Sequence, residues 1–145
     1  LHIIGEGVLK NKIKKLIDEL NLNESVKLFD YQKDLSKFYS QSFLYLSTSK
    51  YESHGLTVSE SLNFKTPSLA FKSCEGLNDI LINGVNGFLI DDQNNKIKNY
   101  ANKIIHLIEN PFIVEDIRKN MVTQNKNDEI YNQWNFLIDY SKTEA

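Results

Sequence analysis

The sequence is poor in cysteine, proline and arginine, with one, two and one residue respectively among 145. Because Cys74 is the single cysteine, a disulfide within the chain is excluded, and the composition fits a reducing compartment such as the cytoplasm. No apolar run approaches the roughly 18 residues of a membrane-spanning helix, and no signal peptide is visible. We therefore expect a cytoplasmic protein that could work at the inner face of the membrane.

The sequence also lacks the usual patterns of a metal or cofactor site. It contains no D-x-D motif for a nucleotide-bound metal, no Cys/His cluster with zinc spacing and no evident Ser–His–Asp arrangement. The pair Asp91–Asp92 is better explained as a loop or a helix start. We expect no metal and no cofactor. The net charge of −2 provides no strong field for nucleic acid, so we expect no nucleic-acid partner.

Apolar runs and helical periods alternate regularly along the chain. A hydrophobic content of 41% is ordinary for a soluble protein, and 145 residues suit one domain with a real core. We predict strands at residues 1–4, 25–29, 43–46, 68–71 and 87–90. We predict helices at residues 8–20, 34–39, 57–64, 76–82, 95–109 and 127–140, with one more beginning at Pro111.

Strands that alternate with helices in this way indicate an α/β fold, with a Rossmann-like, three-layer parallel sheet flanked by helices. Ligands of such sheets bind at the carboxyl ends of the strands. The turns at residues 5–7 and 30–31 and the loop in residues 51–62 all follow predicted strands, so we expect them at this edge. The helix at residues 127–140 could pack on this domain or on a partner domain, and the sequence leaves both open.

The most informative stretch is residues 51–62, YESHGLTVSESL, between a predicted strand and a predicted helix. Glu52 and Glu60 lie eight residues apart, with Gly55 between them. Backbone N–H groups and the positive end of a helix dipole at such a turn can bind a diphosphate or sugar hydroxyls. Ionised carboxylates can accept hydrogen bonds from diols. The competing interpretation is that the spacing of the two glutamates arises by chance and that Gly55 is the glycine of an ordinary strand–helix turn.

The segment YESHGLTVSESLNFKTPSLAF resembles the signature of the retaining glycosyltransferases of family four, which have the GT-B fold. That signature is E-x-F-G-x-x-x-x-E, a helix rich in small residues and a proline that opens the next strand, here Pro67. Downstream, CEGLNDILINGVNGFLI resembles the family's short helix, Asn-Gly turn and final strand. Upstream, LHIIGEG resembles its strand ending in G-x-G. The resemblance covers roughly residues 1–110 in the family's order.

Two departures from the family pattern stand out. Ser53 and His54 occupy positions where the family usually has Gly and Phe. The family also carries an Arg and a Lys upstream of the G-x-G strand that pair with the donor diphosphate, and the chain has neither. The resemblance implies that residues 1–145 form a single donor-binding domain, the C-terminal half of a GT-B fold, without its first strand and helix and without the acceptor domain. We expect such a piece to be inactive alone and to bind nucleotide sugars weakly.

The resemblance assigns roles to the two glutamates. Glu60 would hold the ribose of the nucleotide; the simpler alternative is a glutamate favoured near a helix start by the helix dipole. Glu52 would be the catalytic residue, contacting a hydroxyl of the donor sugar and stabilising the positive charge that develops on its ring. The alternative for Glu52 is a solvated loop glutamate. No enzyme nucleophile is implied, because retention in the family is often attributed to attack on the face from which the diphosphate departs.

The neighbouring donor-binding candidates act mostly through their backbone. Gly55, Leu56 and Thr57 would direct N–H groups toward the sugar and the diphosphate. His54 could stack on the sugar or simply fill the space of the family's Phe, and we favour the second.

Four further candidates follow the first two predicted strands. Gly5 and Gly7 resemble the family's G-x-G, where the backbone passes close to the nucleotide, although a tight turn explains them equally well. Asp30 and Tyr31 follow the second strand, where the family's backbone approaches the base.

The function implied by the resemblance is transfer of a sugar, with retention, from a nucleoside-diphosphate sugar to an unknown acceptor, which is a glycan, a lipid or a protein. Assembly of a bacterial cell-envelope or capsule polysaccharide fits this role. The partners implied are the donor, the acceptor and the protein's own N-terminal acceptor domain. Two alternatives stay open: a non-catalytic sugar-nucleotide-binding subunit and a nucleotide-sugar epimerase of related fold.

The missing first strand leads to a prediction about the sheet. In the family that strand lies between the partners of residues 1–4 and 43–46. Backbone N–H and C=O groups cannot stay buried and unpaired. We therefore predict that the two neighbours pair directly and give the all-parallel strand order 2-1-3-4-5. The alternative is a strand borrowed from another molecule in a swapped dimer.

Overall fold

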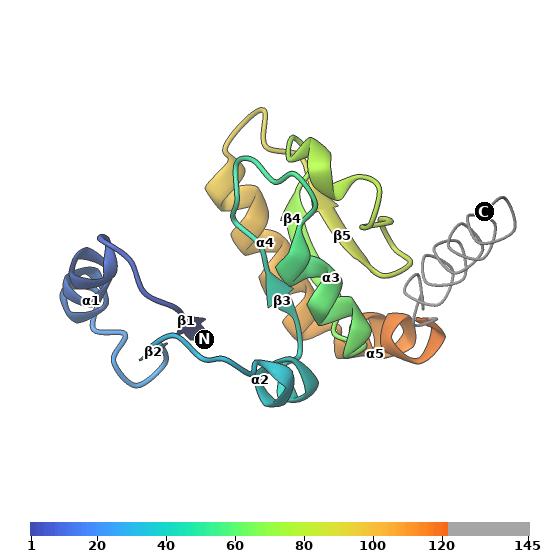
Figure 1. The fold of residues 1–145 in the computed structure, drawn as a ribbon. Helices are drawn as coiled ribbons and strands as arrows, with labels where there is room; N and C mark the ends of the chain where they lie inside the picture. Colours follow the sequence, from blue (N-terminus) through green and yellow to red (C-terminus); the bar gives the residue numbers. More distant parts are fainter. Residues whose placement is uncertain (122–145) are drawn as a thin grey trace, which may run out of the picture. The chain divides into compact units, whose positions relative to one another are not determined.

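The structure is a computed structural model, and it describes residues 1–121. Backbone contacts divide the chain into two compact units, of which the first is Leu1–Lys37 and the second begins at Phe38. Figure 1 labels the helices and strands of both units. The helix predicted at residues 127–140 lies outside the described residues.

The first unit consists of β1 (His2–Ile4), α1 (Lys10–Glu19) and β2 (Lys27–Phe29). The two strands pair in parallel, with His2 opposite Lys27. Parallel neighbours need a long crossover connection, and α1 supplies it. The helix buries Ile17, one of the apolar positions whose spacing predicts a helix here.

The second unit carries a three-stranded sheet and most of the helices. Its elements, with α2 spanning the boundary between the units, are α2 (Ser36–Gln41), β3 (Tyr45–Leu46), α3 (Leu56–Asn63), β4 (Ser68–Phe71), the 3-10 helix η1 (Glu75–Leu77), β5 (Gly87–Ile90), α4 (Lys96–Glu109) and α5 (Pro111–Asn120). The sheet order is β3-β4-β5, with Tyr45 opposite Ser68 and Ser68 opposite Gly87. Each pairing of the described strands is parallel, so the predicted parallel α/β class is confirmed.

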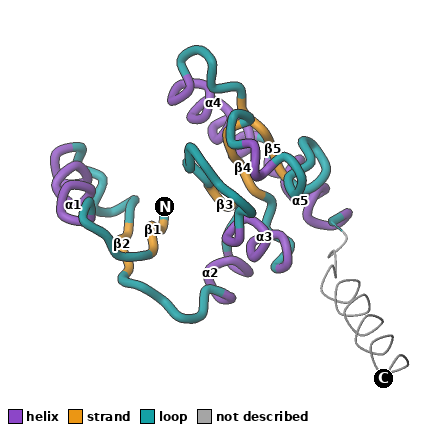
Figure 2. The backbone as a smooth tube through the Cα atoms, turned by 45° about the horizontal axis from the view of Figure 1, so that its top comes forward, coloured by secondary structure: helices purple, strands orange, loops and turns teal. Residues whose placement is uncertain are grey.

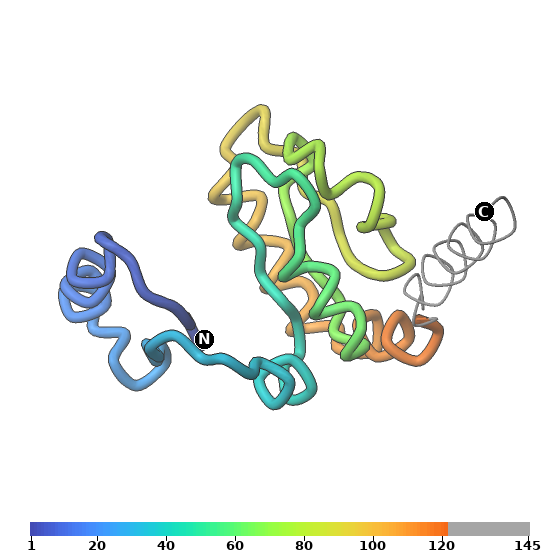
Figure 3. The backbone as a smooth tube through the Cα atoms, in the orientation of Figure 1, coloured from blue at the N-terminus to red at the C-terminus, as the bar shows by residue number. Residues whose placement is uncertain are grey.

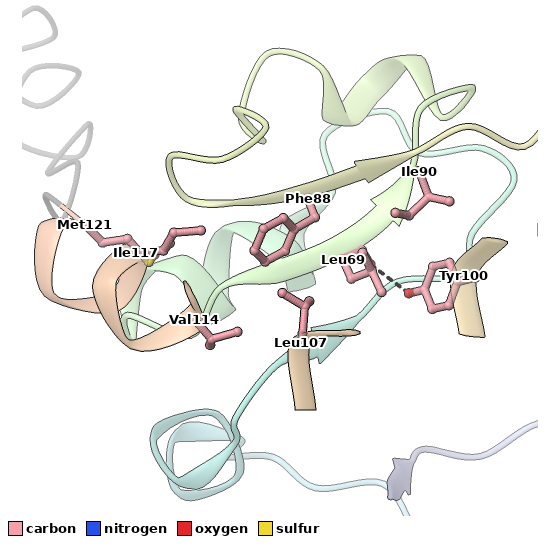
Figure 4. Packing of buried hydrophobic residues seen from close by; sticks show 8 residues of the cluster. All are labelled: Leu69, Phe88, Ile90, Tyr100, Leu107, Val114, Ile117 and Met121. Atoms are coloured by element: carbon pink, nitrogen blue, oxygen red, sulfur yellow. Dashed lines mark hydrogen bonds between the residues drawn. The ribbon is translucent and has the colours of Figure 1, made fainter. Parts of the chain in front are cut away.

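The middle strand β4 is buried on both of its faces. On one face, a cluster joins β4 and β5 to α4 and α5 and consists of Leu69, Phe88, Ile90, Tyr100, Leu107, Val114, Ile117 and Met121 (Figure 4). The other cluster includes α3 and the region of η1 and consists of Val58, Ala70, Cys74, Leu77 and Leu81. Leu69 and Ala70 belong to different clusters because successive side chains of a strand point to opposite faces. Helices therefore cover both faces of this sheet, as predicted (Figure 2).

Two polar side chains tie α4 and α5 to the neighbourhood of β3. The Tyr100 hydroxyl donates to the carbonyl oxygens of Leu69 (2.8 Å) and Ser47 (3.0 Å). Arg118, the single arginine of the chain, donates to the carbonyl oxygens of Ser42 (2.6 Å) and Phe43 (3.1 Å). These bonds satisfy backbone oxygens on either side of β3, so the position of this short strand depends on both helices as well as on β4.

The ladders that the structure describes lie within the two units, as β1-β2 in the first and β3-β4-β5 in the second. The predicted pairing of the first and third strands would join the two units, and it stays a prediction. β3 is shorter than the predicted run 43–46, with only Tyr45 and Leu46 in the ladder.

The helix predicted at residues 76–82 is wrong in form, because the chain makes only the 3-10 helix η1 followed by a turn. The Asn86 side chain closes that turn. It accepts a hydrogen bond from the Ile82 N–H (2.7 Å) and donates one to the Ile80 carbonyl oxygen (2.8 Å). Such side-chain bonds give the backbone an alternative to helical bonds. The other predicted helices within the described residues begin within two residues of their expected starts.

Candidate functional site

The loop of residues 47–55 leads from β3 to α3, as the tube in Figure 3 shows. Gly55 ends the loop as the N-cap of α3, with φ at 51° and ψ at 50°, a left-handed conformation that glycine adopts without steric cost. A Cβ atom at this position would lie 2.2 Å from Leu77 Cδ2. Glycine is therefore required here twice, by the backbone conformation and by the close approach of η1.

The N-terminus of α3 is open. No side chain of the described residues caps it, and the N–H groups of its first turn, including those of Leu56 and Thr57, have no helical acceptor. The Leu56 side chain is 71% exposed, so this turn faces solvent. The strand–loop–helix turn that the sequence predicts is thus present, and its use by a ligand stays a prediction.

Glu52 lies in the loop and is half-buried. Its backbone packs on η1, where a Cβ atom added to Gly76 would lie 1.8 Å from the Glu52 carbonyl oxygen. Cys74 is fully buried next to this contact. Burial raises the pKa of the Cys74 thiol, and the negative charge of Glu52 adds to the shift. The loop is held firmly against η1, and Gly76 is a contributor to the site region that the sequence analysis missed.

Glu60 is exposed on α3 and is held by a residue that is distant in sequence. The Tyr39 hydroxyl, on α2, donates to Glu60 Oε2 at 3.1 Å. Tyr39 itself is only 5% exposed. Burial raises the pKa of the Tyr39 hydroxyl, and the negative charge of Glu60 raises it further. Tyr39 therefore stays a neutral donor, and one Glu60 oxygen has a permanent partner.

Tyr45 on β3 connects the two glutamates. Burial raises the pKa of its hydroxyl, a hydrogen bond with the Thr57 side chain opposes that shift, and the negative charges of Glu52 and Glu60 add to it. Both carboxylates thus lie within electrostatic reach of the same phenol. Three of the predicted positions, Glu52, Thr57 and Glu60, thus lie around Tyr45 within the second unit.

Tyr39 and Tyr45 were missed by the sequence analysis, which assigned their segments to a helix and a strand without a role in the site. Their rings lie edge to face, with centroids 5.7 Å apart. The available signal was a tyrosine, rather than a wholly apolar residue, in each of the two segments that precede the glutamate loop. Such a residue has an apolar body and a polar end that needs a partner when buried. His54, a predicted donor-binding residue, is exposed in the loop.

The other predicted site residues belong to the first unit. Gly5 follows β1 with φ at 134°, and its N–H donates to the Phe29 carbonyl oxygen at 3.1 Å. Asp30 follows β2 and is paired with the Lys10 ammonium group, an interaction that the sequence analysis did not anticipate. Tyr31 is 70% exposed. The two predicted turns therefore lie at the carboxyl ends of β1 and β2, at the same edge of this small sheet.

A cavity of about 690 Å³ lies on the α4 side of the second sheet. Its lining comes from the loop after β3, the ends of β4 and β5 and the first turns of α4. Ser73 donates a hydrogen bond to Asp92 at its rim. The predicted donor-binding residues are not among those that line this cavity, although Tyr51, which precedes Glu52 in the loop, is.

Residues 1–121 contain neither a cluster of metal ligands nor a helix that could span a membrane. No group of three or more His, Cys, Asp and Glu side chains there could hold a metal ion. None of the helices described is long and apolar enough to cross a membrane. The expectation of no metal and no cofactor stays a prediction.

A parallel sheet covered by helices on both faces, with a glycine-capped helix after a short strand, is an α/β arrangement that matches solved structures of GT-B glycosyltransferases. Comparison with known proteins agrees with this class. The chain belongs to the family described as glycosyl transferases group 1, whose model matches residues 1–128.

Two relatives are informative. The poly(ribitol-phosphate) alpha-N-acetylglucosaminyltransferase of Staphylococcus aureus (strain COL) is 34% identical over 137 residues, covering 92% of this chain and 27% of the relative. The poly(glycerol-phosphate) alpha-glucosyltransferase of Bacillus subtilis (strain 168) is 30% identical over 109 residues, covering 75% of this chain and 16% of the relative. The chain thus spans about a quarter or less of the length of these relatives.

Solved structures show the same fold. A TarM mutant of S. aureus, crystallised in complex with fondaparinux, alpha-GlcNAc-glycerol and UDP, is 34% identical with a TM-score of 0.78, covering 94% of this chain and 28% of that protein. The pneumococcal O-GlcNAc transferase GtfA, crystallised with UDP and GlcNAc, has a TM-score of 0.77 at 24% identity, covering 96% of this chain and 29% of that protein. The second likeness shows the fold alone.

Proposed function

We propose that the chain is the donor-binding part of a glycosyltransferase that takes a sugar from a nucleoside-diphosphate sugar. The observation that carries the proposal is one cluster. Glu52 lies in the loop that leads into the open N-terminus of α3, and Glu60 lies on the same helix, where it accepts a hydrogen bond from the Tyr39 hydroxyl at 3.1 Å. Carboxylates accept hydrogen bonds from hydroxyl groups, and a row of N–H groups binds phosphate oxygens. The cluster therefore matches both chemical parts of such a donor.

Each group has its own task in this proposal. The N–H groups of Leu56 and Thr57 bind oxygens of the diphosphate, where negative charge grows as the leaving group departs. Glu60 accepts hydrogen bonds from the ribose hydroxyls. Glu52 accepts one from a hydroxyl of the sugar and stabilises the positive charge of the ring in the transition state. Neither carboxylate forms a covalent bond with the sugar.

The relatives support a finer proposal for the donor and the acceptor. The similar TarM structure contains UDP and alpha-GlcNAc-glycerol, and the two relatives are named for poly(ribitol-phosphate) and poly(glycerol-phosphate). We therefore propose UDP-N-acetylglucosamine or UDP-glucose as the donor and a polyol-phosphate polymer of the cell envelope as the acceptor, with transfer on the cytoplasmic side. Because these donors are α-linked, an α-linked product would mean retention.

A transfer assay on the protein that carries this chain tests the proposal. Either donor is incubated with poly(ribitol phosphate) or poly(glycerol phosphate), and the release of UDP and the incorporation of sugar are both measured. We expect incorporation from one donor and an α-linkage by NMR. Glu115→Gln is the matched control, because Glu115 is exposed on α5 and outside the cluster, and it should retain full activity.

Two other results would contradict the proposal in different ways. Binding of the donor without turnover with any acceptor would favour a non-catalytic subunit. Release of an epimerised nucleotide sugar, with no glycoside formed, would favour an epimerase.

A further inference from the structure

The ring of Tyr39 is fixed on several sides. It stacks on Phe64 with ring centroids 5.8 Å apart and an interplanar angle of 16°, and it meets Tyr45 edge to face. The backbone of the same residue is fixed as well, because the buried Thr66 hydroxyl donates to the Tyr39 carbonyl oxygen at 2.6 Å. These contacts restrict the motion of the Tyr39 ring, so they also fix the position of its hydroxyl group.

The Tyr39 hydroxyl lies next to a carboxylate on the surface of the protein. The hydrogen bond of the Tyr39 hydroxyl that the structure records goes to Glu60 Oε2, at 3.1 Å, and Glu60 is exposed. An exposed glutamate normally samples several rotamers, and one bond to a rigid donor restricts that freedom. Packing alone does not account for the hydroxyl, since phenylalanine would fill the same space between Phe64 and Tyr45.

The contact also leaves Glu60 able to bind a ligand. An ionised carboxylate has about four acceptor positions on its two oxygens. The hydrogen bond from Tyr39 uses one of these positions, on Oε2. A 1,2-diol needs two acceptor positions, so a carboxylate held at one oxygen by Tyr39 can still receive both hydroxyls of a ribose.

We propose that Tyr39 is a positioning residue that orients Glu60 for the ribose of the nucleotide-sugar donor. This inference depends on the function proposed above and extends it to a residue on α2 that does not itself touch the donor. It also explains why a buried tyrosine extends its hydroxyl to a surface glutamate on another helix.

The test is Tyr39→Phe in the protein that carries this chain, with donor KM, kcat and the melting temperature measured together. The ring packing is kept and one hydrogen bond is lost. We expect the KM for the donor to rise about three- to tenfold, the range for one lost hydrogen bond, with kcat much less affected. Glu115→Gln is the control, because Glu115 is exposed on α5 and lies outside the cluster. It should leave the donor KM, kcat and the melting temperature unchanged.

A double-mutant cycle with Glu60→Ala separates positioning from general stability. In the Glu60→Ala background, Tyr39→Phe should have no further effect on the donor KM. An equal rise in both backgrounds would overturn the inference, as would a Tyr39→Phe enzyme with wild-type KM while Glu60→Ala is impaired. If Glu60→Ala itself leaves the donor KM unchanged, the proposed role of Glu60 fails, and the inference fails with it.

Discussion

Glu60 and Glu52 differ in how their surroundings hold them, although both lie near Tyr45. Glu60 is exposed at its carboxylate and bonded to a buried phenol, which suits a group that binds a ligand reversibly. Glu52 is half-buried, and its backbone is pressed against Gly76. A half-buried carboxylate on a closely packed loop suits a charge that stabilises the transition state. The two residues should therefore fail in different ways when mutated.

Replacement of Glu60 by Ala should weaken the binding of UDP by about 1–3 kcal/mol, the range for a lost hydrogen bond to a charged group. The physical reason is that the ribose hydroxyls would lose their carboxylate acceptor. Isothermal titration calorimetry on the protein that carries this chain measures the change. An affinity equal to that of the wild type would contradict the role in binding.

Replacement of Glu52 by Gln should lower kcat while leaving the affinity for bare UDP nearly intact. The amide keeps the shape of the side chain but removes the negative charge that stabilises a positive sugar ring. Steady-state kinetics and UDP titration on the same sample separate the two effects. Normal turnover in this variant would assign Glu52 to the ordinary solvated residues of the loop.

At the scale of elements, the start of α3 is the decisive feature of the second unit. The chain must leave β3, pass η1 and enter a helix whose first N–H groups stay open to solvent. The left-handed conformation of Gly55 makes this turn possible, and Leu77 on η1 occupies the space where a side chain would be. The loop, the 3-10 helix and α3 therefore depend on one another.

Gly55→Ala should destabilise the protein by about 1–3 kcal/mol, from the cost of a left-handed alanine together with the overlap with Leu77. Urea unfolding followed by circular dichroism gives the free energy of unfolding. Gly7→Ala is the control for stability, because a Cβ atom at Gly7 would meet nothing within 4 Å. Equal stability of Gly55→Ala and wild type would show that the turn can rearrange without cost.

At the scale of the whole molecule, each of the two units carries some of the groups predicted to bind a donor. The second unit contains the open N–H groups at the start of α3 and the carboxylates of Glu52 and Glu60. The first unit contains the two turns that follow β1 and β2. Neither unit includes a cluster that could ligate a metal within residues 1–121.

We expect EDTA to leave the transfer activity of the protein that carries this chain unchanged, because N–H groups rather than a metal would meet the diphosphate charge. The measurement is the rate of UDP release with and without the chelator. Loss of activity that magnesium or manganese restores would contradict this expectation.

The sequence by itself determined the class of fold and the position of the glutamate loop. Apolar runs bounded by glycine, proline and asparagine, in alternation with helical periods, predict a parallel α/β protein. The starts of α1, α3, α4 and α5 follow from the local spacing of apolar residues and, for α5, from Pro111, which act over a few residues of chain. The order and spacing of three motifs also sufficed to predict the glycosyltransferase family, which the comparisons confirm.

Only the tertiary structure decided which residues surround the glutamates and how the strands pair. Tyr39 and Gly76 are 21 and 24 residues from Glu60 and Glu52, and no local pattern predicts their contacts. The pairing of β3 with β4 and of β4 with β5 likewise joins segments that are distant along the chain. Local propensity sets the elements, whereas contacts between distant segments depend on packing and on the entropy of bringing those segments together.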